Sequence, residues 1–170
     1  METAEPGGVS ISKQIRRILL EPANTELQPS TEILLYFAAR AQNTAECIKP
    51  AIESGAFVLS DRFTDSTMAY QGYARGLGAE NVLALHRIAC GDLQPDLTLL
   101  LDIDRPTGLE RMKARGKDRI EQENGDFFDR VREGYARIAK ENPDRVRIID
   151  ARGPVSEVSA KIWEEVSRLV

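Results

Sequence analysis

An aspartate followed by an arginine, Asp61 and Arg62, is the pair of residues in this sequence whose types best suit phosphate chemistry. The pair comes directly after a short apolar run, Ala56–Ser60. A carboxylate at the end of a strand can hold Mg²⁺, and an arginine there can grip a phosphate with its planar fork. An ordinary turn that ends a strand can carry the same dipeptide, so the residues around the pair must decide between the two interpretations.

Hydroxyl, amide and aromatic side chains follow the pair. If the chain is helical from Thr64 onward, Ser66 and Tyr70 share one face, and Thr67 and Gln71 lie beside them. These groups are suited to binding a nucleobase or a sugar next to a phosphate-binding arginine.

A second candidate is an aromatic residue one helical turn before an arginine. Tyr36 and Arg40 are four residues apart, so they share a helix face. Such a pair could stack on a planar base and donate a hydrogen bond to its edge. A core aromatic residue beside a solvated arginine is the alternative.

A third candidate is a run of alternating basic residues: Arg111, Lys113, Arg115, Lys117 and Arg119. Glycines lie near the run and Glu121 follows it. A basic, flexible segment of this kind can close over a polyphosphate, supply positive charge to the transition state and exclude water. The alternative is a solvated basic loop, although a local cluster of cations stands out in a chain whose net charge is −4.

The elements that must position these residues alternate between helices and strands. Proline, glycine and apolar spacing predict helices over Ser10–Glu21 (capped by Ser10 or Ser12), Ser30–Ser54 (capped by Ser30 or Thr31 and bent at Pro50), Thr64–Tyr73, Glu80–Cys90, Pro106–Arg115, Phe127–Glu141 and Ser156–Leu169. Strands are predicted at Ala56–Ser60, buried on both faces, and at Asp96–Leu101 and Val146–Ile149, while Met1–Gly8 has the composition of a turn. The alternation predicts an α/β protein with a parallel sheet.

Composition narrows the functional classes. The 170 residues fit one domain, and the negative charge argues against a protein that coats nucleic acid or an anionic membrane. We find no apolar run that could span a bilayer and no signal peptide, so the cytoplasm is the expected compartment. His86 is the only histidine, which excludes a histidine-rich zinc site, and we expect it to be structural, with Cys47 and Cys90 as small hydrophobes.

Together the candidates indicate phosphoryl transfer, which needs positioning, Mg²⁺ and positive charge more than a covalent nucleophile. Enzymes of this kind usually cradle the donor phosphates in a Gly-x-x-x-x-Gly-Lys-Ser/Thr loop. That motif is absent from these 170 residues.

The sequence resembles the bacterial thymidylate kinases along essentially its whole length. The similar segments are Glu5-Pro6-Gly7-Gly8, the helix segment Phe37–Gln42, the block Asp61–Leu77, Gly91–Thr98 and Ala114–Glu123. The resemblance implies a P-loop nucleoside-monophosphate-kinase-like fold, three layers with a parallel sheet, as a single domain over 1–170 with a lid at about 111–123. It implies transfer of the γ-phosphoryl group of ATP to dTMP, giving dTDP for dTTP synthesis, with Mg²⁺, in a homodimer.

The same resemblance implies roles for individual residues. Arg62 would hold the dTMP phosphate and the transferred group, Asp61 would help organise Mg²⁺, and Tyr36 or Phe37 would stack on thymine, the spacing favouring Tyr36. The implied catalytic residues are Asp61, Arg62, Arg111, Arg115 and Arg119, and the implied dTMP-binding residues are Glu5, Pro6, Tyr36, Phe37, Arg40, Arg62, Ser66, Thr67, Tyr70, Gln71 and Glu121.

The chain departs from the family's pattern in two ways. Ala4 stands where the family usually has an arginine, and the family's central first strand, P-loop, following helix and most of its second strand are missing. We therefore expect Met1 not to be the start of the active enzyme. The alternative is a non-catalytic chain that binds dTMP or a protein partner, and a kinase for another nucleoside monophosphate is a further hypothesis.

Overall fold

The computed structural model describes residues 1–112 and 116–169. The chain divides into two compact units, Met1–Leu93 with Lys117–Gly134, and Gln94–Gly116 with Tyr135–Val170. The single domain with a lid at 111–123 stays a prediction.

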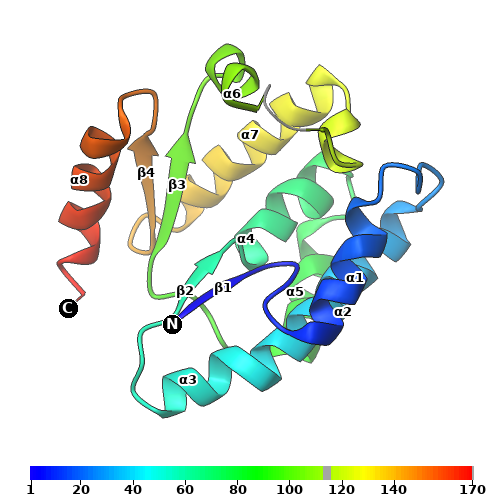
Figure 1. The fold of residues 1–170 in the computed structure, drawn as a ribbon, viewed down its shortest axis with the longest axis horizontal. Helices are drawn as coiled ribbons and strands as arrows, with labels where there is room; N and C mark the ends of the chain where they lie inside the picture. The colour runs from blue at the N-terminus through cyan, green and yellow to red at the C-terminus, as the bar shows by residue number, and fades with distance from the viewer. Residues whose placement is uncertain (113–115, 170) are drawn as a thin grey trace. The chain divides into compact units, whose positions relative to one another are not determined.

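A short parallel strand pair underlies the first unit. Strand β1 (Glu2–Ala4) runs beside β2 (Leu59–Asp61), with Thr3 opposite Ser60 (Figure 1). The prediction of a turn over Met1–Gly8 is therefore wrong for residues 2–4. The strand predicted over Ala56–Ser60 is shifted to 59–61 and is not buried on both faces, since Phe57 is 68% and Leu59 65% exposed. Among the described residues β2 pairs with β1 alone.

Two long helical stretches form the body of this unit. Helix α1 (Ser10–Leu20) packs against α2 (Pro29–Asn43), which continues through a π-helical turn, η1 (Thr44–Ile48), into α3 (Lys49–Glu53). The predicted helix over 30–54 is thus confirmed, with its break next to Pro50. The predicted caps are wrong, because the residues before these helices are Val9 and Gln28, and the buried hydroxyl of Ser12 instead donates to the Ala39 carbonyl, 2.7 Å away.

The segment after β2 is helical, as predicted. It consists of α4 (Thr64–Thr67), a second π-helical stretch, η2 (Met68–Ala74), and α5 (Ala79–Cys90). The unit is completed by the 3₁₀ turn η3 (Ile120–Gln122) and by the first part of α7 (Gly125–Glu141). A π-helical stretch within a helix often marks a functional site.

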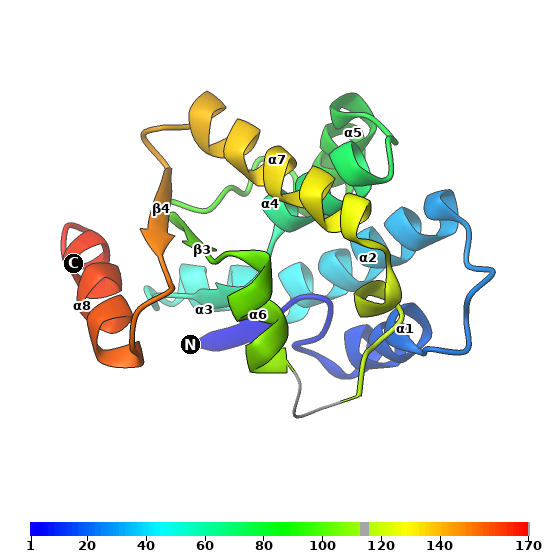
Figure 2. The ribbon, with the colours of Figure 1, turned by 90° about the horizontal axis from the view of Figure 1, so that it is seen from above.

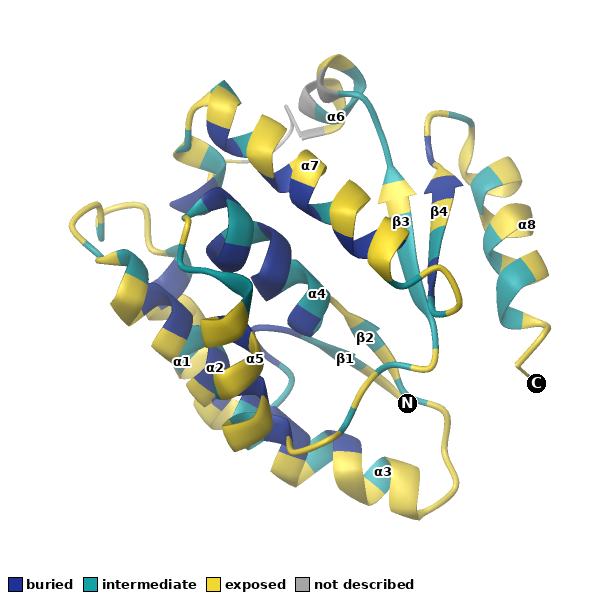
Figure 3. Cartoon of the chain, turned by 180° about the vertical axis from the view of Figure 1, so that it is seen from behind, coloured by how far each residue is buried: buried dark blue, intermediate teal, exposed yellow. Residues whose placement is uncertain are grey.

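The second unit contains another parallel pair. Strand β3 (Thr98–Asp102) pairs with β4 (Val146–Asp150), and α8 (Val155–Val166) lies beside β4 (Figure 2). Helix α6 (Arg105–Met112) follows β3, and the predicted last turn of that helix, 113–115, lies outside the described residues. Helix α8 has no fully buried side chain among its described residues, but Val158, Ile162 and Val166 are half-buried (Figure 3). No helix in the described part of the chain is long and apolar enough to cross a membrane.

The first unit buries polar residues where apolar ones were expected. The apolar residues Leu34 on α2 and Ile88 on α5 are 56% and 83% exposed, whereas Glu32, Arg40 and Asn43 on α2 are 2% exposed or less. Figure 3 shows the buried stretches of α2 and α4 in dark blue. Because burying a charge is costly unless it is paired, these residues need partners, and the partners define the candidate site.

Candidate active site

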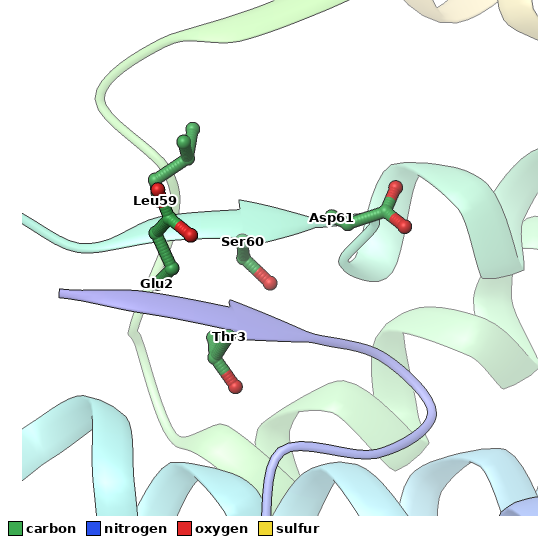
Figure 4. A pocket seen from close by; sticks show the side chains of 5 residues that line it. All are labelled: Glu2, Thr3, Leu59, Ser60 and Asp61. Atoms are coloured by element: carbon green, nitrogen blue, oxygen red, sulfur yellow. The ribbon is translucent and has the colours of Figure 1, made fainter.

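The ends of the two strands in the first unit bring two predicted segments together. The register places Ala4 opposite Asp61, and the Glu5 amide donates to the Asp61 carbonyl at 2.9 Å. The Glu5–Gly8 turn therefore begins beside the Asp61–Arg62 pair, at the carboxyl edge of the strands, where α/β sheets bind ligands. A hollow lined by Glu2, Thr3, Leu59, Ser60 and Asp61 runs along this strand pair (Figure 4).

Glycine is required in this turn. Gly8 has a φ of +74°, and a Cβ atom built on it would lie 2.1 Å from the Asn43 Oδ1 atom. The Arg16 guanidinium also holds the turn, donating to the Pro6 carbonyl at 2.6 Å. The turn is thus fixed closely against α1 and α2.

Arg62 adopts a backbone conformation that is rare for a residue with a side chain. Its φ is 69°, the one positive value found for a non-glycine residue in the described chain. Such a conformation costs about 1–3 kcal/mol and is concentrated at functional sites. The exposed guanidinium lies over the Tyr70 ring, 5.1 Å from its centroid.

Arg40 joins two other predicted substrate-binding residues, Glu5 and Thr67, in one buried contact. Its Nε atom donates to the Glu5 carboxylate at 2.5 Å, and its Nη2 atom donates to the Thr67 hydroxyl at 2.9 Å. The Asn43 amide donates to the second Glu5 oxygen at 3.1 Å. The alternative interpretation of Arg40 as a solvated residue is wrong, since it is 2% exposed.

One atom of this contact has no partner. The Nη1 atom of Arg40 is buried and makes no hydrogen bond in the structure. An unpaired buried donor costs roughly 1–3 kcal/mol, so native proteins rarely leave one without a role. The hydrogen-bonding capacity of this atom is therefore not used within the described chain.

The two aromatic candidates differ in their surroundings. Phe37 is 4% exposed and is covered by the Arg40 guanidinium, which lies 4.8 Å from the ring centroid. Tyr36 is only half-buried, and burial together with the charge of Glu32 raises the pKa of its hydroxyl to about 12. Tyr36 is therefore a neutral phenol with a partly open surface, and Phe37 is part of the core.

Three comparisons with known proteins bear on this arrangement. The sequence profile described as thymidylate kinase matches residues 1–162. The chain is 48% identical to the thymidylate kinase of Syntrophotalea carbinolica over 168 residues, which cover 95% of this chain and 78% of that protein. It is 46% identical to the thymidylate kinase of Alkalilimnicola ehrlichii over 170 residues, which cover 99% of this chain and 78% of that protein.

The chain belongs to the thymidylate kinase family. A crystal structure of thymidylate kinase from Ehrlichia chaffeensis superposes with a TM-score of 0.78 at 29% sequence identity, covering 98% of this chain and 79% of that one. The predictions of an α/β fold like that of the nucleoside-monophosphate kinases and of a phosphotransferase are confirmed at the level of the family.

The helical segment α4–η2 carries the remaining predicted contacts of a thymidylate kinase. Ser66 and Tyr70 are half-buried, whereas Thr67 and Gln71 are 2% and 1% exposed. Ser66 and Tyr70 thus lie on one half-buried face of the helical segment, and Thr67 and Gln71 lie on the buried face beside it, as predicted. Their contacts with dTMP stay predictions.

The predicted lid arginines do not share one environment. Arg111 lies in the second unit, where its guanidinium donates to the Ala151 carbonyl at 3.0 Å, and Arg115 lies outside the described residues. Arg119 lies in the first unit and is 7% exposed. The expectation of a solvated or flexible basic segment is therefore wrong for Arg119, whereas the catalytic roles of the three arginines stay predictions.

Glu121 is held by a reciprocal pair of hydrogen bonds at the start of η3. The Asp118 amide donates to the Glu121 carboxylate at 3.1 Å, and the Glu121 amide donates to the Asp118 carboxylate at 2.9 Å. This is the arrangement of a capping box. It fixes the backbone of the segment that carries Glu121.

The sequence interpretation missed Glu32 and Arg75. Glu32 is fully buried and accepts hydrogen bonds from Gln71, Arg75 and Arg119. A signal was present, because Glu32 precedes Tyr36 by four residues and Arg40 by eight, so all three lie along one face of the helix.

A metal ion has one candidate ligand here. The described residues contain no group of three or more His, Cys, Asp and Glu side chains that could hold a metal. Mg²⁺ often binds through one or two carboxylates together with substrate phosphates. The exposed carboxylate of Asp61, at the end of β2, fits that kind of site.

Proposed function

We propose that this chain binds dTMP as the phosphoryl acceptor in the transfer of the γ-phosphoryl group of ATP to dTMP, which gives dTDP. The observation that carries the proposal is the buried, unpartnered Nη1 atom of Arg40. A carbonyl oxygen on the edge of thymine would satisfy this donor. Membership of the thymidylate kinase family supports the assignment.

The neighbours of Arg40 supply the other contacts that an acceptor nucleotide needs. Tyr36, one helical turn earlier, offers the half-buried ring on which thymine would stack, since the Phe37 ring is already covered by Arg40. Ser66 and Tyr70 would line the sugar side of the pocket. Glu5 fixes the Arg40 guanidinium through a buried ion pair, so binding would not have to order it.

Arg62 is the residue suited to the dTMP phosphate. Its backbone conformation and its contact with the Tyr70 ring hold an exposed guanidinium at the strand end, where a phosphate can accept its two parallel N–H bonds. Phosphoryl transfer spreads negative charge over the equatorial oxygens, and a fixed cation stabilises that charge without reorganising.

Mg²⁺ would bind to Asp61 and to phosphate oxygens, and it would neutralise the charge that develops on them when bound. Arg111 and Arg115 are proposed to act on the phosphates from the lid, Arg119 to hold the lid segment in place, and Glu121 and Pro6 to act from the edge of the acceptor site. We further infer a homodimer, as the family resemblance implies. We place the protein in the cytoplasm, where dTTP is synthesised.

The test is dTMP binding by the 170-residue chain. We expect dTMP at 100 times its dissociation constant to stabilise the protein by about 2.7 kcal/mol and to raise its melting temperature by about 5–10 °C. The control is dAMP at the same concentration, which has a purine base and should give a much smaller shift. A folded chain whose melting temperature does not respond to dTMP would contradict the proposal.

Turnover is measured separately, as ADP formed from ATP and Mg²⁺ in the presence of dTMP or UMP. Faster turnover with dTMP supports the assignment. A preference for UMP would favour a kinase of another nucleoside monophosphate.

A further inference from the structure

The most deeply buried carboxylate of the described chain is Glu32, in the first turn of α2. It is fully buried, and both of its oxygens are occupied. The Oε1 atom accepts from Gln71 Nε2 at 2.8 Å and from Arg75 Nε at 3.2 Å. The Oε2 atom accepts from Arg75 Nη2 at 3.1 Å and from Arg119 Nη2 at 2.6 Å.

These donors keep Glu32 ionised. Burial alone would raise the pKa of this carboxyl, but the hydrogen bonds from Arg75, Gln71 and Arg119 outweigh burial and lower it. An ionised carboxylate only accepts hydrogen bonds, so each partner must present a donor to it. The contact therefore fixes the orientation of the Gln71 amide as well as the two guanidinium groups.

The partners of Glu32 come from two segments that are distant in the sequence. Gln71 and Arg75 lie on or directly after η2, the stretch that also carries Tyr70. Arg119 lies immediately before η3, two residues from Glu121. Glu32 is thus the point at which the helical segment of the nucleotide pocket and the lid segment 117–123 meet.

Arg119 is bound too firmly for an arginine that reaches a reacting phosphate. Besides its contact with Glu32, its Nε atom donates to the Leu19 carbonyl at 2.8 Å, and its backbone amide donates to the Leu20 carbonyl at 3.1 Å. It therefore fastens the lid segment to the end of α1 and the start of α2. Arg75 adds a second link, since its Nη1 atom lies 2.6 Å from the Glu123 carboxylate.

We propose that Glu32 is a positioning residue that couples the nucleotide pocket to the lid segment 117–123. The proposal rests on the proposed function for its ligand, dTMP, which would bind against the α4–η2 segment. When dTMP orders the α4–η2 segment, it also orders Gln71 and Arg75. Their hydrogen bonds then hold the Glu32 carboxylate in place, and Glu32 in turn holds Arg119. On this proposal Arg119 is also a positioning residue rather than a catalytic one.

The proposal is tested by amide hydrogen exchange, read separately for the segments 70–76 and 117–123. In the wild-type chain, dTMP should slow exchange in both segments. In Glu32→Gln, which keeps the size of the side chain and removes its charge, dTMP should still slow exchange at 70–76 but no longer at 117–123. Glu32→Asp keeps the carboxylate and should restore part of the effect at 117–123.

The matched control is Glu26→Gln, the same change at an exposed position. It should leave the response of both segments as in the wild type. A merely structural role of Glu32 would speed exchange in the free protein but would leave the response of segment 117–123 to dTMP intact. That outcome would overturn the proposal.

A second measurement needs neither ligand nor a stable Glu32→Gln variant. Arg119→Lys keeps the positive charge but loses the forked contact with Glu32 and Leu19. In the free protein it should speed exchange several-fold at 70–76 as well as at 117–123. Faster exchange confined to 117–123 would overturn the coupling, whereas a wild-type chain that fails to bind dTMP would count against the proposed function alone.

Discussion

The two units of this chain differ in how far their ion pairs are buried. In the first unit the Glu5–Arg40 pair is 2% exposed at both ends, and Glu32 is fully buried between two arginines. In the second unit none of the described ion pairs is fully buried, and the side chains of Asp150 and Arg152, for example, are 46% and 65% exposed. The hydrogen bond from Arg152 lowers the pKa of Asp150, but solvent screens exposed pairs of this kind.

This difference in burial distinguishes charged side chains at the surface from charged side chains that shape a binding site. A buried ion pair is an inefficient way to stabilise a protein, because apolar residues of the same volume often do as well or better. The first unit nevertheless places charges inside, and two of these residues, Glu5 and Arg40, are at positions that the family resemblance assigns to dTMP binding. We infer that these charges are kept to hold a binding site in shape.

The largest effect should come from removing one partner of a buried pair. Arg40→Met leaves the Glu5 carboxylate buried without its ion-pair partner, and we expect the free energy of unfolding to fall by about 3–5 kcal/mol. Urea denaturation measures it. The double variant Arg40→Met, Glu5→Gln should regain part of the loss, and additive losses would show that the pair does not act as a unit.

Arg62 should affect binding far more than folding. Loss of its guanidinium removes a charged hydrogen bond to the phosphate, so Arg62→Ala and Arg62→Gly should each weaken dTMP binding by about 2–3 kcal/mol, measured by calorimetry. The two variants should differ in stability. At a φ of 69°, glycine avoids the strain that alanine keeps, and Arg62→Gly should be more stable than Arg62→Ala by roughly 1 kcal/mol. Equal stabilities would contradict strain at this position.

The Glu5–Gly8 turn should tolerate no side chain at Gly8. Gly8→Ala places a methyl group against Asn43, and we expect a loss of about 2–3 kcal/mol in unfolding free energy. The control is Gly55→Ala, where φ is also positive, at +79°, but the space is open. It should cost only about 1 kcal/mol, and similar losses at both positions would mean that backbone strain alone decides.

The free energy of unfolding of the first unit should also depend on pH. Burial and the nearby charge of Arg40 lower the pKa of His86 below its ordinary value of 6.5, so protonation favours the unfolded chain. Stability from this group is complete above pH 6.5 and is lost as the pH falls below it, by at most about 1.4 kcal/mol per pH unit. His86→Gln should remove that slope in thermal denaturation between pH 7 and pH 5. An unchanged slope would assign it to other groups.

The smallest effect is expected in the second unit. Arg168, just after α8, is 57% exposed and pairs with Glu164 and Glu165 in the last turn of that helix. Arg168→Gln should change the unfolding free energy by about 0.5 kcal/mol or less. A loss as large as that of Arg40→Met would break the contrast between the units.

Elements with strong periodicity could be predicted from the sequence. Helices α5 and α7 and strands β3 and β4 lie within two residues of their predicted bounds, because glycine, proline and apolar spacing mark them locally. Strand β1 could not be predicted, since three residues in a turn-like composition become a strand only through pairing with β2.

The candidate site was partly predictable for the same reason. Asp61, Arg62 and Arg40 are recognisable from residue type and spacing, but burial depends on which elements pack together. The solvated interpretation of Arg40 and the omission of Glu32 both follow from this, because a polar residue on a helix is expected to face solvent unless another segment supplies its partner. That partner, Arg119, is 87 positions away from Glu32.

The attachment of Arg119 to the end of α1 also has a consequence for how the protein folds. The hydrogen bond from its guanidinium to Leu19 joins residues 100 positions apart. Contacts that close such long loops are entropically unfavourable until the intervening chain is ordered, and chains that depend on them fold slowly. We therefore expect the segment 117–123 to dock after α1, α2 and α5 have assembled. Loss of this docking contact should speed unfolding while leaving the folding rate nearly unchanged.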